Sequence, residues 1–365
     1  MILFRGNGEF RFENGSQAAM KALLLSQYKH LEIADLPDPL LGAGEVLISV
    51  AACGICGSDV HGYDGSSGRR IPPIVMGHEA AGTIAALGTG VSGFAKGDRV
   101  TFDSTIFCGA CDNCRRGDVN LCDHRQVLGV YCAEFRRPGA FAEYVAVPSR
   151  ILYRLPGNLS FNEAAMLEAV SVALHGVSLA QISKGSTALV IGAGMIGLLT
   201  LQALRAAGCS RVYVADLDST RLKLAREVGA TAVLSSQEDV VEQVMQLTRG
   251  VGVDAVIEAV GRNETVKASI ESVRKGGTVV LVGNISPEVT LPLQKVVTRQ
   301  IRLQGSCASA GEYPRAIELL ASGAIQVKPF ITAVAPLEEG PRWFERLYAR
   351  EPNLMKVILT PGTVS

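Results

Sequence analysis

Chemically reactive side chains cluster in one short segment that follows an apolar run. Residues 51–61 hold two thiols, Cys53 and Cys56, in a C-x-x-C pattern. Such a pair suits redox chemistry or half of a four-thiolate zinc site. It also suits small buried residues beside a polar turn, because a motif this short is weakly specific. The polar residues that follow on the segment are Ser58, Asp59 and His61.

A second group of cysteines is much denser. Its spacing is C-x₂-C-x₂-C-x₇-C, within a loop rich in glycine and charged residues. Four thiolates at this spacing can surround zinc tetrahedrally and leave no open position, which is typical of a structural site. The spacing fits neither ferredoxin pattern, which disfavours an iron–sulfur cluster. We therefore predict a structural zinc bound by Cys108, Cys111, Cys114 and Cys122.

If Cys56 binds a metal, its other ligands must be of different residue types. His78 and Glu79 form a Gly-His-Glu segment beside apolar and small residues, and Glu168 lies in an otherwise apolar helical stretch. An unpaired carboxylate in such a stretch is costly. Each residue alone has an ordinary explanation: a core histidine, a solvated charge and a charge on a helix face. Their occurrence together with Cys56 predicts a second, mixed-ligand metal site.

A glycine motif, residues 192–197, follows an apolar strand and opens a helix. The first glycine allows a tight turn, the second lets a pyrophosphate approach, and the third lets helix and strand pack closely. The helix N-terminus then offers free N–H groups to the phosphates. The motif predicts a dinucleotide site that includes Gly192, Gly194, Met195, Ile196 and Gly197.

The strand after this motif ends in a carboxylate, Asp216. An acidic residue there accepts hydrogen bonds from the ribose hydroxyls and repels a 2′-phosphate, which favours NAD over NADP. Arg221 begins the following helix, where it either stacks on the adenine or is solvated.

The local patterns predict two domains of different architecture. Between residues 20 and 147, short β-type runs alternate with glycine and proline turns, which favours a mostly β domain. The spacing is helical over 159–180. From residue 186 onward, apolar strands alternate with amphipathic helices, which is typical of a doubly wound parallel sheet. The fold class is thus β combined with α/β. Strands are predicted at 21–25, 46–50, 80–87, 99–102, 142–147, 188–192, 211–216, 232–234, 254–260, 278–283, 301–305 and 356–360, and helices at 195–207, 219–228 and 312–321.

Composition narrows the functional classes. The 365 residues suit two cores, and a formal net charge of zero gives no basic excess for nucleic acid or a membrane surface. Nine cysteines without a signal peptide indicate a reducing compartment, the cytoplasm. The uncharged stretch 185–204 is long enough for a membrane span, but its glycine spacing favours the dinucleotide site. Residues 1–19 mix charge with glycine and asparagine and are expected to be a disordered extension.

Taken together, these motifs resemble the zinc-dependent medium-chain dehydrogenases/reductases. The resemblance runs from Met20 to about Pro361, and within the family the chain looks most similar to the polyol (sorbitol-type), galactitol-phosphate and threonine dehydrogenase branch. Segments 167–172 and 215–222 carry the likeness to that branch. The motifs that occur in the family's order are 56–59, 77–79, 97–100, 108–122 and 192–197.

The resemblance implies a GroES-like catalytic domain, residues 20–169, interrupted by a Rossmann domain at 170–309 and completed by 310–365. It implies that Cys56 and His78 bind a catalytic zinc, and that Glu79 and Glu168 are direct or water-mediated ligands. It also gives three residues roles around the substrate and two positions beside the cofactor. These are Ser58 at the substrate oxygen, Asp59 as an orienting carboxylate, His61 as the outer member of a proton relay, and Val260 and Val282 at the cofactor.

The expected function is NAD-linked oxidation of a secondary alcohol to a ketone, with two zinc ions per chain and a homo-oligomeric assembly, dimer or tetramer, through the region 285–303. Two departures from the branch stand out: Ala169 replaces a proline, and Ala308-Ser309 replaces an Arg-Tyr pair, which disfavours sorbitol itself. The alternatives are L-threonine 3-dehydrogenase, a zinc-free quinone reductase of the same fold, and a non-enzymatic zinc- and nucleotide-binding protein.

Overall fold

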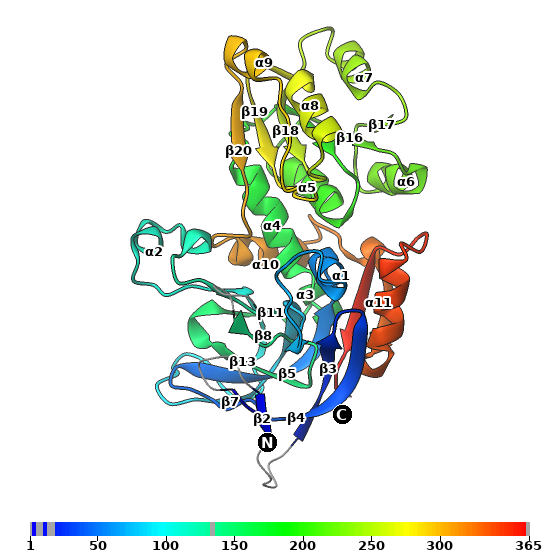
Figure 1. The fold of residues 1–365 in the computed structure, drawn as a ribbon. Helices are drawn as coiled ribbons and strands as arrows, with labels where there is room; N and C mark the ends of the chain where they lie inside the picture. Colours follow the sequence, from blue (N-terminus) through cyan, green and yellow to red (C-terminus); the bar gives the residue numbers. More distant parts are fainter. Residues whose placement is uncertain (1, 5–9, 13–18, 132–135, 363–365) are drawn as a thin grey trace. The chain divides into compact units, whose positions relative to one another are not determined.

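The chain folds into two compact units in a computed structural model that describes residues 2–4, 10–12, 19–131 and 136–362. The first unit is Met1–Glu168 together with Lys328–Ser365, and the second is Ala169–Val327. Figure 1 shows sheets in the first unit and a sheet flanked by helices in the second. This combination confirms the fold class predicted from the sequence.

A mixed sheet forms the centre of the first unit, in the order β14-β8-β7-β5-β22-β21, with β13 also paired to β5. The last strand, β22, pairs with β5 near Cys53, so the C-terminal segment completes a sheet begun much earlier in the chain. The strands are β5 (Glu45–Gly54), β7 (Glu79–Leu87), β8 (Arg99–Phe102), β13 (Tyr144–Pro148), β14 (Leu152–Arg154), β21 (Ile331–Pro336) and β22 (Lys356–Thr360).

A smaller sheet, β4-β3-β6, lies in the same unit. Buried and exposed residues alternate along β3, as expected when one face packs on a core. The shared core contains Leu23, Ile48, Phe102, Phe141 and Phe344. The remaining strands are β3 (Ala19–Gln27), β4 (His30–Pro37), β6 (Ile74–Val75), β9 (Thr105–Ile106), β10 (Gln126–Val127), β11 (Val130–Tyr131) and β12 (Arg136–Arg137), and the helices are α1 (Gly57–Tyr63), α2 (Asp112–Arg116), α3 (Phe161–Ala164) and α11 (Gly340–Tyr348).

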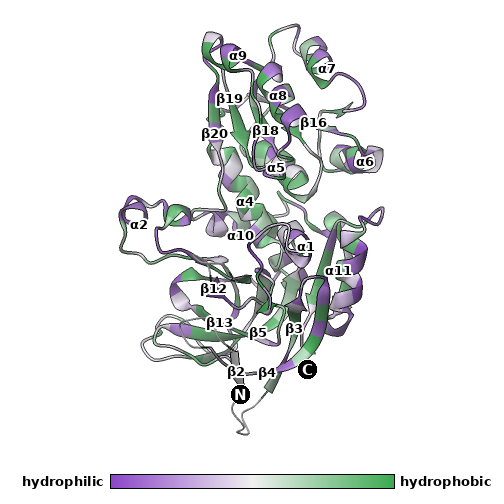
Figure 2. Cartoon of the chain, in the orientation of Figure 1, coloured by the Kyte–Doolittle hydropathy of each residue, from purple (hydrophilic) through white to green (hydrophobic). Residues whose placement is uncertain are grey.

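The second unit is built on a six-stranded parallel sheet, in the order β17-β16-β15-β18-β19-β20. The chain order reverses between β15 and β18, and such a switch point is where doubly wound sheets bind ligands. Figure 2 shows hydrophobic central strands, with hydrophilic positions on flanking helices such as α6. The strands are β15 (Thr187–Ile191), β16 (Arg211–Asp216), β17 (Ala232–Ser235), β18 (Val253–Glu258), β19 (Val273–Leu281) and β20 (Arg302–Gly305), and the helices are α4 (Leu167–Ser178), α5 (Met195–Ala206), α6 (Ser219–Glu227), α7 (Val240–Leu247), α8 (Asn263–Ser272), α9 (Leu293–Thr298) and α10 (Tyr313–Ala321).

The border between the units lies later in the chain than the predicted start of the C-terminal catalytic part at residue 310. Residues 310–327 belong to the second unit because α10 is tied to it. The His175 Nδ1 to Glu312 Oε1 distance is 2.7 Å, and the Gln202 amide bonds the backbone of Gln326 at 2.9 Å. The assignment of catalytic and cofactor roles to the two units stays a prediction at this point.

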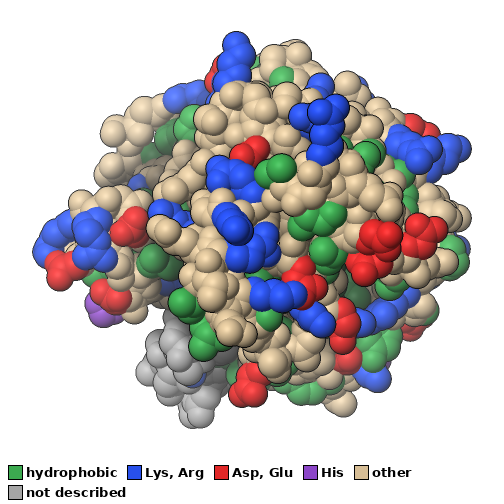
Figure 3. All heavy atoms as spheres, turned by 90° about the horizontal axis from the view of Figure 1, so that it is seen from above, with side chains coloured by type: hydrophobic (Ala, Val, Ile, Leu, Met, Phe, Trp, Pro, Cys, Tyr) green, Lys and Arg blue, Asp and Glu red, His purple; other side chains and the backbone are tan. Residues whose placement is uncertain are grey.

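The predicted disordered extension, 1–19, falls mostly on residues outside the described ones. In its described part, β1 (Ile2–Phe4) pairs antiparallel with β2 (Phe10–Phe12), which the sequence did not predict. Within the described ranges, none of the helices combines the length and apolar character of a membrane span. The uncharged stretch 185–204 is divided between β15 and α5 instead. On the face drawn in Figure 3, basic and acidic side chains are interspersed.

Candidate functional site

Strand β5 delivers the first chemical group of the site. It ends at Gly54, and Cys56 follows as the N-cap residue of the short helix α1. The Asp59 carboxylate, one turn along, accepts a hydrogen bond from the Cys56 backbone N–H at 3.3 Å. Reciprocal capping of this kind fixes the first turn of a helix. Cys56 and Asp59 are therefore held in a defined relation to each other.

The Gly-His-Glu segment reaches the same place through strand pairing. Glu79 opens β7 and is the register partner of Gly54 in β5. The preceding Gly77 has φ +95°, and a Cβ there would lie 2.8 Å from the backbone N of Phe141. Only glycine meets both conditions. The turn therefore places the buried His78 and Glu79 beside the end of β5.

The donor atoms of Cys56, His78 and Glu79 lie within 4.8 Å of one another. A thiol, an imidazole and a carboxylate together make a ligand set that zinc accepts. The buried Nδ1 of His78 has no hydrogen-bond partner among the described residues, although Asp59 Oδ1 lies 3.4 Å away. A carboxylate facing Nδ1 leaves the other ring nitrogen for a metal, so the three predicted residues fit a zinc ion.

Two pKa shifts reflect the charges in this centre. Burial alone would lower the pKa of His78, but the neighbouring Asp59 and Cys56 outweigh it and raise that pKa well above its usual value. Burial would raise the pKa of Asp59, yet His78 and then Arg70 lower it to about 2. Asp59 therefore stays a carboxylate over the physiological pH range, as an orienting group for the histidine requires.

A buried lysine, which the sequence did not predict, completes the surroundings of Glu79. Lys356 Nζ lies 2.5 Å from Glu79 Oε2 and 3.0 Å from the carbonyl of Ile55. Burial would lower the pKa of Lys356, but Glu79 and then Cys56 raise it. The available signal was a lone lysine opening an apolar strand, β22. Lys356 compensates the buried carboxylate, and whether Glu79 also binds metal directly stays a prediction.

Glu168 does not belong to this group of closely spaced donor atoms. It sits in the first turn of α4 and is not one of the residues whose donor atoms gather within 4.8 Å. Burial, offset in part by His78 and reinforced by Glu79, raises its pKa to about 7. Glu168 therefore belongs to the same electrostatic neighbourhood, and its role as a direct or water-mediated ligand stays a prediction.

The predicted substrate-side residues lie on α1. Ser58 and His61 are both exposed. The Ser58 Oγ accepts a hydrogen bond from Arg70 Nη2 at 3.1 Å, a contact that sequence reasoning missed. The roles of Ser58 at the substrate and of His61 in a proton relay stay predictions.

The four-cysteine cluster is brought together as predicted. The donor atoms of all four residues lie within 4.8 Å, and the Cys108–Cys114 and Cys111–Cys122 sulfur pairs are both 3.9 Å apart. A tetrahedral zinc with bonds of ~2.3 Å separates its sulfurs by about 3.8 Å, which fits. The four thiols are free rather than disulfide-bonded.

Hydrogen bonding and burial shift the pKa values of these thiols in opposite directions. Those of Ala110 and Cys111 donate to Cys108 Sγ at 3.3 Å each and lower the pKa of Cys108 to about 6. Burial and the neighbouring thiols raise the pKa of Cys114 to about 12. The protein alone thus favours one thiolate, and a dication would stabilise the others.

The glycine motif forms the β15–α5 turn, as predicted. A Cβ at Gly197 would overlap the carbonyl oxygen of Gly192. Gly192 itself has φ +101°, and a Cβ there would lie 2.7 Å from Val260 Cγ2. Gly194 is the N-cap residue of α5. The turn is therefore compact enough for a dinucleotide backbone to approach. Val282 follows β19, which pairs with β18, and donates its backbone N–H to the backbone carbonyl of Glu258.

Asp216 ends β16 beside this turn. Its carboxylate accepts hydrogen bonds from the backbone N–H of Ala193 at 2.6 Å and of Asp218 at 2.9 Å. Arg221 is nearly half exposed on α6, and its Nε lies 3.7 Å from Asp218. The structure thus joins Asp216 to the glycine turn, and the roles of Asp216 and Arg221 toward a bound cofactor stay predictions.

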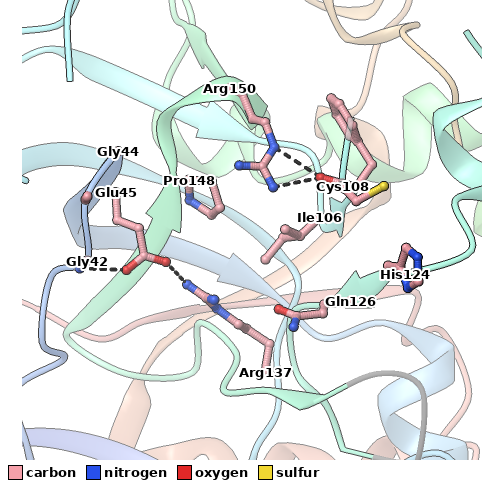
Figure 4. Close-up of a pocket in the computed structure, with 12 residues that line it drawn as sticks. Gly42, Gly44, Glu45, Ile106, Cys108, His124, Gln126, Arg137, Pro148 and Arg150 are labelled. Carbon is pink, nitrogen blue, oxygen red and sulfur yellow. Dashed lines mark hydrogen bonds and ion pairs between the residues drawn. The ribbon is translucent and has the colours of Figure 1, made fainter. Parts of the chain in front are cut away.

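A cavity of about 480 Å³ lies beside the cysteine cluster and includes Cys108. Figure 4 shows two arginines in it, Arg137 and Arg150. Arg137 is paired with Glu45, and Arg150 donates to the carbonyl of Phe107 at 2.7 Å. Because both guanidinium groups already have protein partners, we assign no ligand to this cavity. It contains none of the residues predicted for catalysis.

Comparison with known proteins identifies the class. Residues 42–157 match the alcohol dehydrogenase GroES-like domain, and residues 196–322 match the zinc-binding dehydrogenase domain. The chain therefore belongs to the zinc-binding alcohol dehydrogenases, within the polyol dehydrogenase-like medium-chain group, which confirms the resemblance predicted from its motifs.

Individual relatives lie within this group. Sorbitol dehydrogenase of Bacillus subtilis is 35% identical over 94% of this chain and 98% of its own. L-idonate 5-dehydrogenase of Vitis vinifera is 36% identical over 86% of both chains. A crystal structure from Sinorhizobium meliloti, described as a zinc-binding dehydrogenase bound to NADP, is similar to this chain with a TM-score of 0.86 and 36% sequence identity. The match covers 94% of this chain and all of the crystallised chain.

Proposed function

We propose that this protein is a zinc-dependent dehydrogenase that oxidises a secondary hydroxyl of a polyol or sugar alcohol to a ketone, with hydride transfer to NAD. The observation that carries the proposal is the gathering of Cys56, His78 and Glu79 donor atoms within 4.8 Å. The same chain holds a glycine turn joined to Asp216. The names of relatives, which include a sorbitol and an L-idonate dehydrogenase, support the polyol class.

Two cofactors supply the chemistry that the side chains lack. Zinc, held by Cys56 and His78 with Glu79 and Glu168 as direct or water-mediated ligands, supplies Lewis acidity toward the substrate hydroxyl, and NAD supplies the hydride acceptor. A second zinc at the four cysteines is structural, because four thiolates leave no position for substrate.

The remaining tasks fall to protein groups. Asp59 orients the ring of His78. The Ser58 hydroxyl lies on the exposed side of α1, where it would contact the substrate oxygen, accept the proton of the substrate hydroxyl and pass its own proton to His61 or solvent. In the second unit, the glycine turn and α5 bind the pyrophosphate, and Val260 and Val282 border the cofactor. Such alignment of the reacting carbon with the cofactor contributes much of the rate.

Asp216 favours NAD over NADP in this proposal, since its carboxylate repels a 2′-phosphate. The Sinorhizobium meliloti relative was crystallised with NADP, so the two cofactors need direct comparison. We expect a higher kcat/KM with NAD. A preference for NADP would overturn the cofactor assignment and leave the metal-site assignment standing.

We further propose a homo-oligomer, dimer or tetramer, in the cytoplasm. The occupant of the interface is a second copy of the chain. Three side chains that are more than half exposed, Ile285, Leu293 and Val297, lie in the region that precedes β20. Among the described strands, β20 pairs only with β19, so its other edge is open to a partner strand. Light scattering on the purified chain would measure the mass, and a monomer at micromolar concentration would contradict this.

One substrate screen tests the main proposal. The purified chain would be assayed with NAD against polyols, sugar phosphates, threonine and simple secondary alcohols, and its zinc counted by elemental analysis. We expect two zincs per chain and the highest kcat/KM with a polyol or sugar alcohol. Preference for threonine would replace the substrate class, and no NAD-linked turnover together with no zinc would overturn the proposal.

A further inference from the structure

A buried arginine lies directly behind the proposed substrate-side residue. Arg70 is only 4% exposed, and its Nη2 donates to Ser58 Oγ and to Asp59 Oδ1, at 3.1 Å in each case. Ser58 and Asp59 are adjacent on α1, so one guanidinium joins a hydroxyl to the carboxylate that faces His78. Arg70 comes from the loop between α1 and β6 and belongs to none of the motifs identified in the sequence.

The path of this side chain is built into α1. A Cβ at Gly62 would overlap Arg70 Cγ and would lie 2.8 Å from Arg70 Cβ. Gly62 stands four positions after Ser58, on the same face of the helix. Because Gly62 has no side chain, the aliphatic part of Arg70 can pass over this position and reach Ser58. The backbone at Arg70 is held by a bridge to Tyr131.

The direction of the hydrogen bond has a chemical consequence. A guanidinium has donors only, whereas a hydroxyl has one hydrogen and two lone pairs. Ser58 Oγ must therefore accept from Arg70, and its own hydrogen is left for another partner. After the proton transfer, Ser58 carries the proton taken from the substrate, and the nearby positive group strengthens that hydroxyl as a donor to the oxygen that has gained negative charge.

One donor of the Arg70 guanidinium is not satisfied within the part of the chain that the structure describes. Its Nε is buried and has no hydrogen-bond partner among the described residues. Unsatisfied buried donors are rare in proteins and call for an explanation. Neutralising Asp59 alone does not explain why Arg70 also reaches Ser58, since His78 already faces that carboxylate.

From these contacts we infer that Arg70 is a positioning residue, which fixes the direction and the polarity of the Ser58 hydroxyl toward the substrate oxygen. The inference rests on the proposed function, in which Ser58 contacts that oxygen. It concerns the reacting step, so Arg70 acts on kcat and leaves the binding of the rest of the substrate, and hence KM, nearly unchanged.

A double-mutant cycle tests this. Arg70→Met, Ser58→Ala and the double variant would be assayed with the best alcohol from the substrate screen. A lost hydrogen bond to a charged group predicts that Arg70→Met lowers kcat by about 10- to 100-fold. In the Ser58→Ala background, the same change should cost less than about threefold, because its target is gone. An undiminished loss in that background would show that Arg70 acts through Asp59, and would overturn the inference.

Three further variants separate positioning from support of the fold. Arg70→Lys keeps the charge and a donor, so kcat should return to within about tenfold of the wild type. Gly62→Ala keeps the arginine, but the added methyl group occupies the space of the Arg70 side chain. It should therefore reproduce the kcat loss of Arg70→Met. Arg69→Met, at the exposed neighbouring position, should leave kcat unchanged. A wild-type kcat in Gly62→Ala would contradict the inference even if Arg70→Met failed to fold.

Two readouts other than turnover accompany the cycle. Zinc per chain should be the same in Arg70→Lys, Gly62→Ala and the wild type. The thermal unfolding midpoint should be the same in Arg70→Lys and the wild type, and lower in Gly62→Ala, because the displaced arginine leaves the buried Asp59 with one partner fewer. Loss of zinc in step with loss of kcat would assign Arg70 a structural role and overturn the inference. If the wild type turns over no alcohol, the proposed function fails. If the wild type is active, Ser58→Ala is impaired and Arg70→Met is not, the inference about Arg70 alone fails.

Discussion

The two cysteine-containing clusters of the first unit differ in how far apart their ligands lie along the chain. The four-cysteine cluster draws all its donors from residues 108–122, and backbone N–H groups of the same loop support them. The mixed cluster takes Cys56 from the end of β5 and His78 and Glu79 from the start of β7. Its supporting cation, Lys356, comes from β22, near the end of the chain.

This difference separates what each cluster does. A closed set of like ligands within one loop depends mainly on that loop, so its metal contributes stability. A set gathered from several strands depends on the register of the whole sheet, and its mixed donors leave room for chemistry. We therefore expect changes at the mixed cluster to act first on turnover, and changes at the four-cysteine cluster to act first on stability.

The largest effect is expected from Cys56→Ser. Removing the thiolate should abolish the catalytic zinc and lower kcat by at least about 1,000-fold, since Lewis acidity toward the hydroxyl is lost. Elemental analysis should find one zinc per chain instead of two, with little change in the unfolding midpoint. As a control, Cys209→Ser alters a buried cysteine of the second unit, outside both clusters, and should keep two zincs per chain. Near-normal turnover by Cys56→Ser would remove Cys56 from the catalytic centre.

Cys111→Ser should give the opposite pattern. Opening the closed shell should lower the thermal unfolding midpoint by on the order of 10 °C, because metal binding to such a site is coupled to folding. The fraction that stays folded at low temperature should keep a kcat within about threefold of the wild type. Calorimetry with paired zinc analysis measures both. An unchanged midpoint would mean that the four-cysteine cluster is not a structural site, and the contrast between the clusters would fail.

The four-cysteine cluster could be predicted from the sequence more completely than the mixed cluster, for a physical reason. The cysteine spacing and the glycine motif are local, so their geometry is contained in a few consecutive residues. The gathering of Cys56 with His78 and Glu79 depends on the β5–β7 register. The co-occurrence of these residue types predicted a mixed-ligand site, and the family resemblance supplied the role of each ligand. Most elements were also placed well: strands 99–102, 211–216 and 356–360 match β8, β16 and β22.

What escaped prediction depends on long-range contacts or weak periodicity. Lys356 contacts Glu79 only because β22 pairs with β5. Arg70 contacts Ser58 only because Gly62 leaves space for the arginine side chain beside α1. The lone lysine that opens an apolar strand signals a buried charge but does not identify Glu79 as its partner, and Arg70 leaves no local signal. Helices α7 and α8 were also missed: α8 has few apolar positions, and α7, although mostly apolar, has only eight residues.

Lys356→Met tests whether the mixed cluster needs its distant support. Breaking a buried ion pair from one side leaves Glu79 uncompensated, which should lower the free energy of unfolding by about 3–5 kcal/mol. The double variant Lys356→Met/Glu79→Gln should recover part of that loss, because no buried charge then remains unpaired. Lys328→Met is a suitable control, since Lys328 pairs with Glu163 at the surface and should contribute less than about 1 kcal/mol. Urea unfolding supplies the numbers, and equal losses in the single and double variants would argue against charge compensation.

Glu168 gives the smallest effect and bears on how the mixed cluster holds its metal. Its pKa is raised to about 7, from an ordinary value of 4.5, mainly by burial. A carboxyl with a higher pKa in the folded chain binds more protons when folded, so stability falls as the pH rises from 4.5 toward 7. Metal-stripped Glu168→Gln should therefore be more stable than metal-stripped wild type at about pH 8, by roughly 1–3 kcal/mol, with the difference shrinking at about pH 5.

A matched control reverses the sign. Burial would raise the pKa of Glu163, but hydrogen bonds from Ser160 outweigh it and lower that pKa, so Glu163→Gln should be the less stable chain at about pH 8. Adding zinc then separates the two modes of ligation. If Glu168 binds zinc directly, zinc should make the wild type more stable than Glu168→Gln at about pH 8, since the metal stabilises the ionised carboxylate. If the order found without metal persists at saturating zinc, Glu168 is not a direct ligand, and the zinc depends on Cys56, His78 and Glu79.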